Sequence, residues 1–161
     1  MEAWIGLGSN LGDRTAWLHW ALDALARLPH TRCIARSGLW QSPAFEAEGP
    51  DYLNAVARLD TQLDPYTLLA GLQALERFAG RTRPYPNAPR TLDLDLLLNG
   101  QTVIKTPTLT LPHPRLHQRA FVLRPLAQIN RDLLIPGIGT VQEALAAVAD
   151  QACEPWPAQE N

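Results

Sequence analysis

The chain contains little lysine and little cysteine, and it lacks any long apolar run. Its 161 residues include 14 basic side chains, of which Lys105 is the only lysine. The two cysteines, Cys33 and Cys153, lie far apart without metal-ligand spacing, which predicts reduced structural thiols. No run reaches the ~18 apolar residues that a membrane span needs, and the first residues show no signal-peptide pattern. We therefore expect a cytoplasmic protein with no membrane partner.

Length and composition predict one globular domain over residues 1–161. With 46% hydrophobic residues, the chain can bury one core but is too short for two ordinary domains. The formal net charge of -2 hides an asymmetry, because residues 77–131 contain nine basic side chains and only two acids, Asp93 and Asp95. Nearly all of these basic residues are arginines, whose planar guanidinium suits bidentate binding of phosphate. The middle of the chain is therefore a candidate phosphate-binding region.

The most informative stretch is 89–98 (PRTLDLDLLL), which places two carboxylates inside an otherwise apolar strand. Side chains alternate along a strand, so Asp93 and Asp95 point the same way, roughly 7 Å apart, while Leu94 points to the other face. An unpaired buried carboxylate costs several kcal/mol, so the pair needs a positive partner. Magnesium is usually held by one or two carboxylates plus substrate phosphates. The pair predicts a metal site, with structural salt bridges to arginine as the alternative.

Hydrophobic spacing and capping residues predict the order strand, helix, strand, strand, helix, strand. Asp13 caps a first helix, and Asp64 followed by Pro65 begins a second one that ends at Gly80. The predicted strands span residues 3–8, 31–41, 52–63 and 91–98, and the predicted helices span 13–28, 64–80, 118–129 and 141–149. This is a ferredoxin-like α+β fold, with helices packed on one face of an antiparallel sheet and C-terminal helical additions. The other face is then free for a ligand, and the tail, 153–161, is expected to fray.

Arginines and one histidine flank the acidic strand. Residues 80–90 join the second helix to this strand and place Arg81 and Arg90 at their ends, where both can be aimed at the acidic pair. Phosphoryl transfer needs this combination, because its catalysis is mostly positioning and charge neutralisation. His113 lies between two prolines that restrict its backbone. The arginines predict a phosphate site, with a solvated loop of surface arginines as the alternative. From its spacing alone, His113 is either a structural histidine or a contact to the substrate.

Several motifs occur in a specific order along nearly the whole chain. They are 8–12 (GSNLG), 42–43 (SP), 51–55 (DYLNA), Glu76, 80–81 (GR), 89–95 (PRTLDLD), 111–113 (LPH), Arg119 and Phe121. Together they resemble the 6-hydroxymethyl-7,8-dihydropterin pyrophosphokinase family of the folate pathway. The resemblance implies transfer of pyrophosphate from ATP, the co-substrate, to the hydroxymethyl oxygen of a reduced pterin, with release of AMP.

The resemblance also implies a role for each matching residue. Asp93 and Asp95 are similar to the carboxylates that hold two magnesium ions, and with Arg81 and Arg90 they form the catalytic set. The matches to ATP-binding positions are Glu76, Arg81, Arg90, His113 and Arg119. The matches to pterin-binding positions are Ser42, Pro43, Phe45, Tyr52, Asn54 and Phe121. Stacking between two rings and hydrogen bonds to the ring edge suit a flat heteroaromatic such as a pterin.

The resemblance breaks in the loop before Pro89. Pro86, Asn87 and Ala88 stand where family members often carry a basic residue and a tryptophan. Because proline restricts the backbone, we expect a stiffer lid over ATP than is usual in the family.

Other functions stay open at this point. They are a catalytically weakened relative that binds nucleotide or pterin, another Asp-x-Asp metal-dependent transferase, and a single-stranded RNA-binding module suggested by the basic segment. The RNA-binding modules of this fold use exposed aromatics in a Lys/Arg-Gly-Phe type of motif, which the sequence does not contain. We therefore expect small-molecule substrates, no nucleic-acid partner and a monomer.

Overall fold

The computed structural model describes residues 1–43, 51–80 and 91–157. Within them, the centre of the molecule is a six-stranded antiparallel sheet. Its strands are β1 (Glu2–Ser9), β2 (Thr31–Arg36), β3 (Leu39–Ser42), β4 (Tyr52–Thr61), β5 (Asp93–Asn99) and β10 (Glu154–Trp156). β4 lies between β1 and the arm formed by β2 and β3, and β1 lies between β4 and β5. This arrangement confirms the predicted α+β class and is compatible with a ferredoxin-like order.

Capping residues begin the two long helices where the sequence predicts them. Asp13 precedes α1 (Arg14–Ala26), and its carboxylate accepts a hydrogen bond from the N–H of Ala16 at 3.1 Å. Asp64 caps α2 (Pro65–Phe78) by accepting from two backbone N–H groups of the first turn. Such caps satisfy N–H groups that have no partner inside the helix. Gly80 follows α2 with a φ of 74°, the left-handed conformation that favours glycine.

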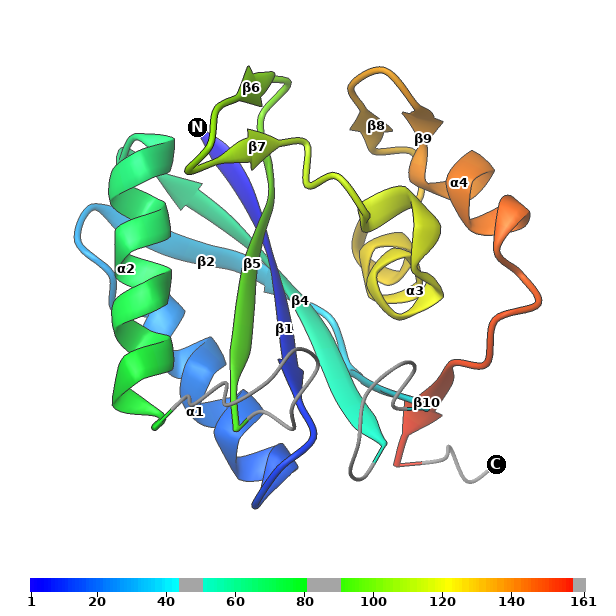
Figure 1. The fold of residues 1–161 in the computed structure, drawn as a ribbon, viewed down its shortest axis with the longest axis horizontal. Helices are drawn as coiled ribbons and strands as arrows, with labels where there is room; N and C mark the ends of the chain where they lie inside the picture. Colours follow the sequence, from blue (N-terminus) through cyan, green and yellow to red (C-terminus); the bar gives the residue numbers. More distant parts are fainter. Residues whose placement is uncertain (44–50, 81–90, 158–161) are drawn as a thin grey trace.

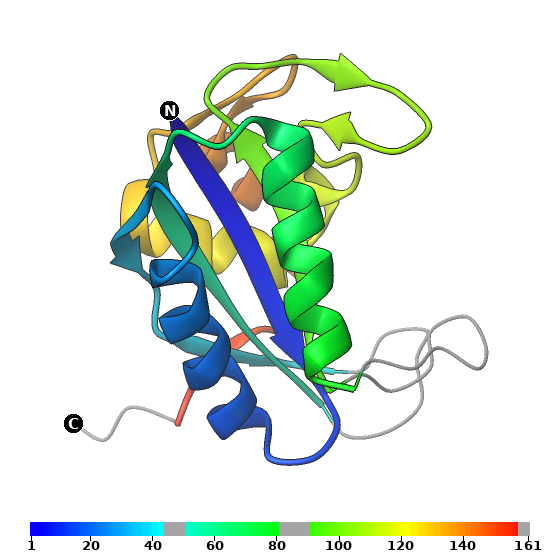
Figure 2. The ribbon, with the colours of Figure 1, turned by 90° about the vertical axis from the view of Figure 1, so that its left-hand side faces the viewer.

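The sheet separates two layers of helices (Figures 1 and 2). α1 and α2 cover one face, where their leucines pack against alternate residues of β1, β4 and β5 in one buried cluster. α3 (Ala120–Asn130) and α4 (Val141–Ala147) pack on the opposite face against Trp4, Val56 and Leu97. The prediction of helices on one face therefore holds for α1 and α2, while the C-terminal additions cover part of the other face.

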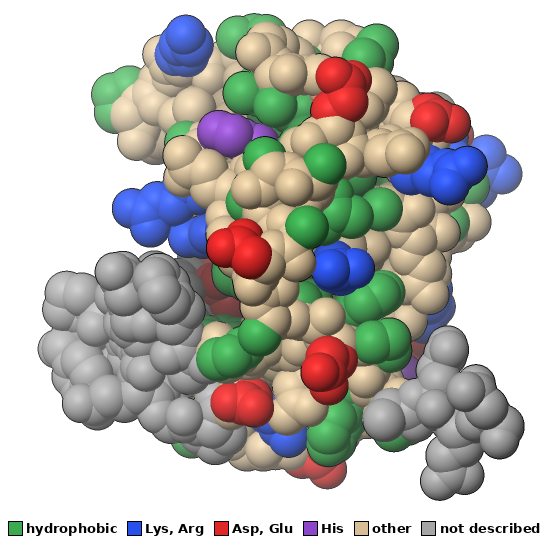
Figure 3. All heavy atoms as spheres, turned by 90° about the vertical axis from the view of Figure 1, so that its right-hand side faces the viewer, with side chains coloured by type: hydrophobic (Ala, Val, Ile, Leu, Met, Phe, Trp, Pro, Cys, Tyr) green, Lys and Arg blue, Asp and Glu red, His purple; other side chains and the backbone are tan. Residues whose placement is uncertain are grey.

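Short elements complete the described chain. They are β6 (Ile104–Lys105), β7 (Thr110–Leu111), the 3-10 helix η1 (Leu116–Gln118), β8 (Leu134–Ile135) and β9 (Gly139–Thr140). Acidic and basic side chains are interspersed on the α3 and α4 side of the molecule (Figure 3). No helix in the described part of the chain is long and apolar enough to cross a membrane.

The expectation of a frayed tail is wrong for residues 154–156. They form β10, which pairs with β3 so that Trp156 lies opposite Leu39. The prolines at positions 155 and 157 hide this strand in the sequence, because proline is found mainly on edge strands or outside sheets. Residues 158–161 lie outside the described residues.

Candidate active site

The floor of the candidate site is a row of paired residues at the end of β1 and the beginnings of β4 and β5. Gly8 pairs with Asn54 on one side and with Asp93 on the other. Directly paired residues point to the same side of a sheet, so Asn54 and Asp93 share a face, about 10 Å apart across two strand spacings. One row further along, Gly6 pairs with Asp95. The positions of β1 between Asn54 and Asp93 and beside Asp95 are therefore glycines, and the side chain of Asn54 lies over Gly8.

The acidic pair projects from β5 as its alternation predicts. Leu92, Leu94 and Leu96 are buried in the cluster beneath α1 and α2. Asp93 and Asp95 are half-buried on the opposite face, and the side chain of Asp95 is 34% exposed. A register shift in the pairing with β1 then ends the strict alternation, because Trp4 pairs with Leu98 and Ile5 with Leu96.

Glu76 supports the acidic strand from the α2 side. Its side chain is buried, with 3% exposure, and its Oε2 accepts a hydrogen bond of 2.9 Å from the backbone N–H of Leu94. Leu94 lies between the two aspartates, so this contact holds the backbone from which both carboxylates project. The role of Glu76 in ATP binding stays a prediction from the sequence.

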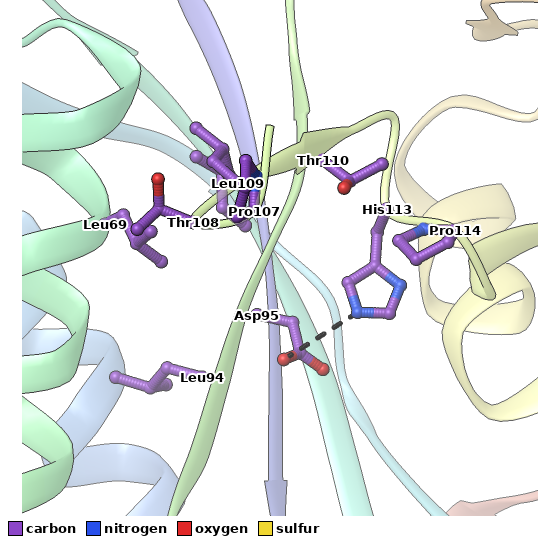
Figure 4. Close-up of a pocket in the computed structure, with 10 residues that line it drawn as sticks. Leu69, Leu94, Asp95, Pro107, Thr108, Leu109, Thr110, His113 and Pro114 are labelled. Atoms are coloured by element: carbon purple, nitrogen blue, oxygen red, sulfur yellow. Dashed lines mark ion pairs between the residues drawn. The ribbon is translucent and has the colours of Figure 1, made fainter. Parts of the chain in front are cut away.

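His113 faces the acidic pair from the segment that follows β7. Its Nε2 lies 4.0 Å from Oδ1 of Asp95, and its backbone N–H donates to the carbonyl of Leu97 at 2.9 Å (Figure 4). Its Nδ1 accepts from the backbone N–H of Arg115 at 3.2 Å. A neutral imidazole that accepts at Nδ1 carries its proton on Nε2. The ring therefore presents an N–H group toward Asp95.

Burial lowers the pKa of His113 from 6.5 to about 4. This pKa already includes smaller effects, because the positive charges of Arg119 and Arg115 also lower it and the negative charge of Asp93 raises it. His113 is consequently neutral at pH 7, and its contact with Asp95 is that of a polar N–H group beside a carboxylate rather than an ion pair.

We expect the neutral His113 to make stability depend on pH between 6.5 and about 4. The unfolded chain takes up the proton first as the pH falls, so this contribution is complete above pH 6.5 and is lost by about pH 4, with an upper limit of about 3 kcal/mol. Urea unfolding at pH 7 and pH 4.5 should show a smaller loss of stability in His113→Gln than in the wild type. The exposed His19→Gln is the matched control, and equal losses in all three proteins would contradict this prediction.

A pocket of about 240 Å³ opens beside His113 and Asp95. Figure 4 shows Leu69 of α2, Leu94 and Asp95 of β5 and the turn between β6 and β7 around it. Thr106 holds this turn: its backbone N–H donates to the carbonyl of Leu109, and its hydroxyl accepts from the Leu109 N–H. The lining residues Pro107, Thr108 and Leu109 of this turn and Thr110 of β7 were not predicted from the sequence. Their only local signal is a proline in a threonine-rich segment, which predicts a turn but no ligand.

A second group of predicted residues gathers at the other end of the floor. The Ser42 hydroxyl donates to Oδ1 of Asn54 at 3.3 Å, and Nδ2 of Asn54 donates to the carbonyl of Leu7 at 3.4 Å. Both side chains are buried, so this amide has a fixed orientation. A Cβ added to Gly8 would lie 2.9 Å from Nδ2 of Asn54, which makes Gly8 part of the same subsite. Tyr52 pairs with Ser42 and shares the face of Asn54.

The other predicted residues fall into two sets. The guanidinium of Arg119 lies 5.5 Å from the centre of the Phe121 ring, at the beginning of α3, and Pro43 is exposed beside Ser42. Phe45, Arg81, Arg90 and the loop that contains Pro86, Asn87 and Ala88 lie outside the described residues. Their roles, including the stiff lid, stay predictions from the sequence.

The fold and the site together define a class of protein. One face of an antiparallel α+β sheet carries two carboxylates beside a pocket and, across Gly8, a buried amide of fixed orientation. This arrangement is typical of an enzyme that transfers a phosphate-containing group with the help of a metal ion.

Comparisons with known proteins identify the family. Residues 4–131 match the model of the 7,8-dihydro-6-hydroxymethylpterin-pyrophosphokinase (HPPK) family. The chain is 44% identical over 157 residues to the 2-amino-4-hydroxy-6-hydroxymethyldihydropteridine pyrophosphokinase of Pseudomonas aeruginosa, and the match covers 97% of each chain. It is 42% identical over 151 residues to the enzyme of that name from Haemophilus influenzae, which covers 93% of this chain and 94% of the other. The chain belongs to the HPPK family.

Solved structures share this fold. The HPPK-DHPS protein of Plasmodium falciparum, crystallised with pterin and p-hydroxybenzoate, superposes with a TM-score of 0.72 at 12% identity. The match covers 92% of this chain and 43% of the longer one. At this low identity the likeness shows a common fold.

Proposed function

We propose that this chain carries out the reaction for which its family is named. It transfers pyrophosphate from ATP to the hydroxymethyl group of 6-hydroxymethyl-7,8-dihydropterin, giving AMP and the pterin diphosphate in folate biosynthesis. The observation that carries this proposal is the row from Asn54 through Gly8 to Asp93. It places an amide that can hydrogen-bond a ring edge and a carboxylate that can hold a metal on one surface, on residues whose Cα atoms are about 10 Å apart.

The pterin would bind at the Asn54 end of this floor. An asparagine side chain has two N–H donors and two acceptor lone pairs. Ser42 and Leu7 occupy one of each, so one donor and one acceptor are left for the ring edge. Tyr52 would stack on the ring from β4, and Phe121 from α3, as the resemblance implies. Because Gly8 has no side chain, the Asn54 amide can lie over it beside the Tyr52 ring.

ATP would bind at the opposite end, with its base in the pocket. The pocket volume of about 240 Å³ is smaller than the ~300–1,000 Å³ of typical sites for whole ligands, so it suits the base alone. Leu69, Leu94 and Leu109 supply its apolar walls, and Asp95 and His113 line the polar side. The triphosphate would extend from there toward the acidic pair. The Nε2–H of His113 and the guanidinium of Arg119 would then donate to phosphate oxygens.

Asp93 and Asp95 would hold two magnesium ions. Their donor set fits magnesium, which prefers oxygen ligands and keeps positions for water and substrate phosphates. Both carboxylates are half-exposed on the open face of β5, so a phosphate group can reach an ion bound there. When bound, the ions neutralise the charge of the triphosphate. The main-chain contact from Glu76 would keep both carboxylates aimed at this position.

The hydroxymethyl oxygen would attack the β-phosphorus of ATP in line. A bond forms between this oxygen and the β-phosphorus, and the bond from the β-phosphorus to the bridging oxygen of the α-phosphate breaks. AMP leaves with the bridging oxygen, and the hydroxyl proton passes to water. Arg81 and Arg90 would neutralise the transferring group, a role worth roughly 10³- to 10⁵-fold in comparable enzymes.

The partner predictions follow from the same site. The proposed substrates, ATP and a reduced pterin, are small molecules. The absence of a nucleic-acid partner stays a prediction from the sequence. The monomeric state and the cytoplasmic location stay predictions from the sequence.

Product analysis tests this function. Purified protein is incubated with ATP and 6-hydroxymethyl-7,8-dihydropterin, with magnesium or with a chelator, and the nucleotides are separated. AMP that forms only with both the pterin and magnesium supports the proposal. Pyrophosphate released together with a nucleotidyl product would instead indicate another Asp-x-Asp transferase, and the absence of turnover would indicate a relative that only binds its ligands.

A further inference from the structure

The C-terminal strand β10 lies beside the strand that carries Ser42. Glu154 pairs with Gln41 of β3, and Trp156 pairs with Leu39 (Figure 1). The family model ends at residue 131, so β10 lies outside the matched range. Trp156 is half-buried against the main core, which fixes this short strand despite Pro155 within it and Pro157 directly after it. β3 is thus held on both edges, by β4 and by β10.

Trp156 also reaches the beginning of β4 through Arg14. The Arg14 guanidinium lies 5.5 Å from the centre of the Trp156 ring, and its Nη1 donates to the backbone carbonyl of Asp51 at 2.6 Å. The Asp51 carboxylate accepts from the Gln41 side chain at 3.1 Å. A cation over an indole ring is attracted by the electron-rich face of the ring, so Trp156 restricts where Arg14 can point. The aromatic side chain of Trp156 therefore supports both β3 and the beginning of β4.

These two segments carry Ser42, Tyr52 and Asn54, three of the residues predicted to bind the pterin. Ser42 is the last residue of β3, and its hydroxyl sets the orientation of the Asn54 amide. Tyr52 follows directly after Asp51, the residue that Arg14 holds. The ends of strands fray unless they are tied down, and here the ties come from β10 and from Arg14. A change at Trp156 should therefore loosen Ser42 and Tyr52 together.

We propose that Trp156 is a positioning residue for the pterin: through Arg14 and Asp51 it fixes the relative placement of Ser42, Asn54 and Tyr52. This inference rests on the proposed function. It gives β10, which supplies no group to the reaction, a role in the binding of the pterin alone. Because the pocket and the acidic pair are built from α2, β5 and the β6–β7 turn, the binding of ATP should not depend on this contact.

Steady-state kinetics with each substrate varied in turn test the proposal. Trp156→Ala should raise the KM for the pterin about two- to fivefold, the size expected from loss of one partly exposed cation–π contact, while the KM for ATP stays unchanged. Trp156→Phe keeps an aromatic face for Arg14 and should largely restore the pterin KM. Glu154→Ala, on the same strand with an exposed side chain, is the matched control and should match the wild type.

Arg14→Gln provides an independent variant, because it removes the contact of Arg14 with the Trp156 ring while leaving β10 in place. This variant should also raise the pterin KM. The double variant with Trp156→Ala should show little further increase in this KM, since both changes interrupt the same chain of contacts from Trp156 through Arg14 to Asp51. Unchanged pterin KM in both single variants would overturn the inference, as would KM values for pterin and ATP that rise together with a lower Tm. A wild-type protein that forms no AMP would instead defeat the proposed function.

Discussion

Replacing Asp95 with alanine is expected to lower kcat for AMP formation by at least about 10²- to 10³-fold, the usual cost of removing one group that stabilises transition-state charge. The carboxylate would hold magnesium beside the transferring phosphates, and the neutral His113 cannot substitute for it as an anionic ligand. The assay measures AMP at saturating ATP, pterin and magnesium. Undiminished activity in this variant would overturn the assignment of Asp95 to the metal.

The fold should survive this substitution. The Asp95 side chain is 34% exposed on the ligand face, so its removal leaves the leucine packing of β5 intact. We expect the Tm to shift by no more than about 4 °C. Asp132→Ala removes an exposed carboxylate remote from the acidic strand in sequence and serves as the matched control, with wild-type activity expected. A large fall in Tm for Asp95→Ala would mean that the aspartate acts in folding.

Replacing Asn54 with leucine is expected to lower kcat/KM for the pterin by about 10²- to 10³-fold. This loss is smaller than the roughly 10⁴- to 10⁵-fold discrimination reached when the polar groups of a site are left wholly unpaired. Leucine has a similar size but offers neither the donor nor the acceptor that the amide directs at the ring edge. Binding of a non-hydrolysable ATP analogue should be unchanged, because the pocket lies on the other side of Gly8. Isothermal titration with each ligand measures the two affinities separately.

A paired variant separates recognition from stability. Asn54→Leu leaves the buried Ser42 hydroxyl without its acceptor, which costs about 1–3 kcal/mol of folding free energy. Adding Ser42→Ala removes this unpaired group and should restore much of the stability. Pterin turnover should stay low in the double variant. Recovery of turnover together with stability would contradict the direct role of the Asn54 amide.

Local signals predicted a large part of the fold. The carboxylates of Asp13 and Asp64 begin α1 and α2 as expected, because capping depends on residues only two or three positions away. The alternation that places Asp93 and Asp95 on one face is equally local, and the structure confirms it. The separation of β2 from β3 at Ser37 was missed. The hydroxyl and N–H of Ser37 bond to the backbone of Val56, a partner that is distant in the sequence.

The site was predicted in its residue types more than in its geometry. No pattern within β1 indicates that Gly8 lies between Asn54 and Asp93, because this row depends on the register of three strands. The turn that closes the pocket carries no residue of catalytic type, and its position depends on packing between β5 and β7. β10 escaped prediction because its stability comes from pairing with β3 and from the burial of Trp156, neither of which a proline-rich tail reveals.

The path of the β-phosphorus tests the central claim most directly. Protein in excess over ATP labelled at the β-phosphorus is mixed with the pterin and magnesium, and the products of a single turnover are separated. We predict that the label moves entirely to the pterin diphosphate while unlabelled AMP forms in equal amount. Label found in ADP would show transfer of the γ-phosphate alone, and label found in free pyrophosphate would show transfer of the nucleotide; either result would contradict the account.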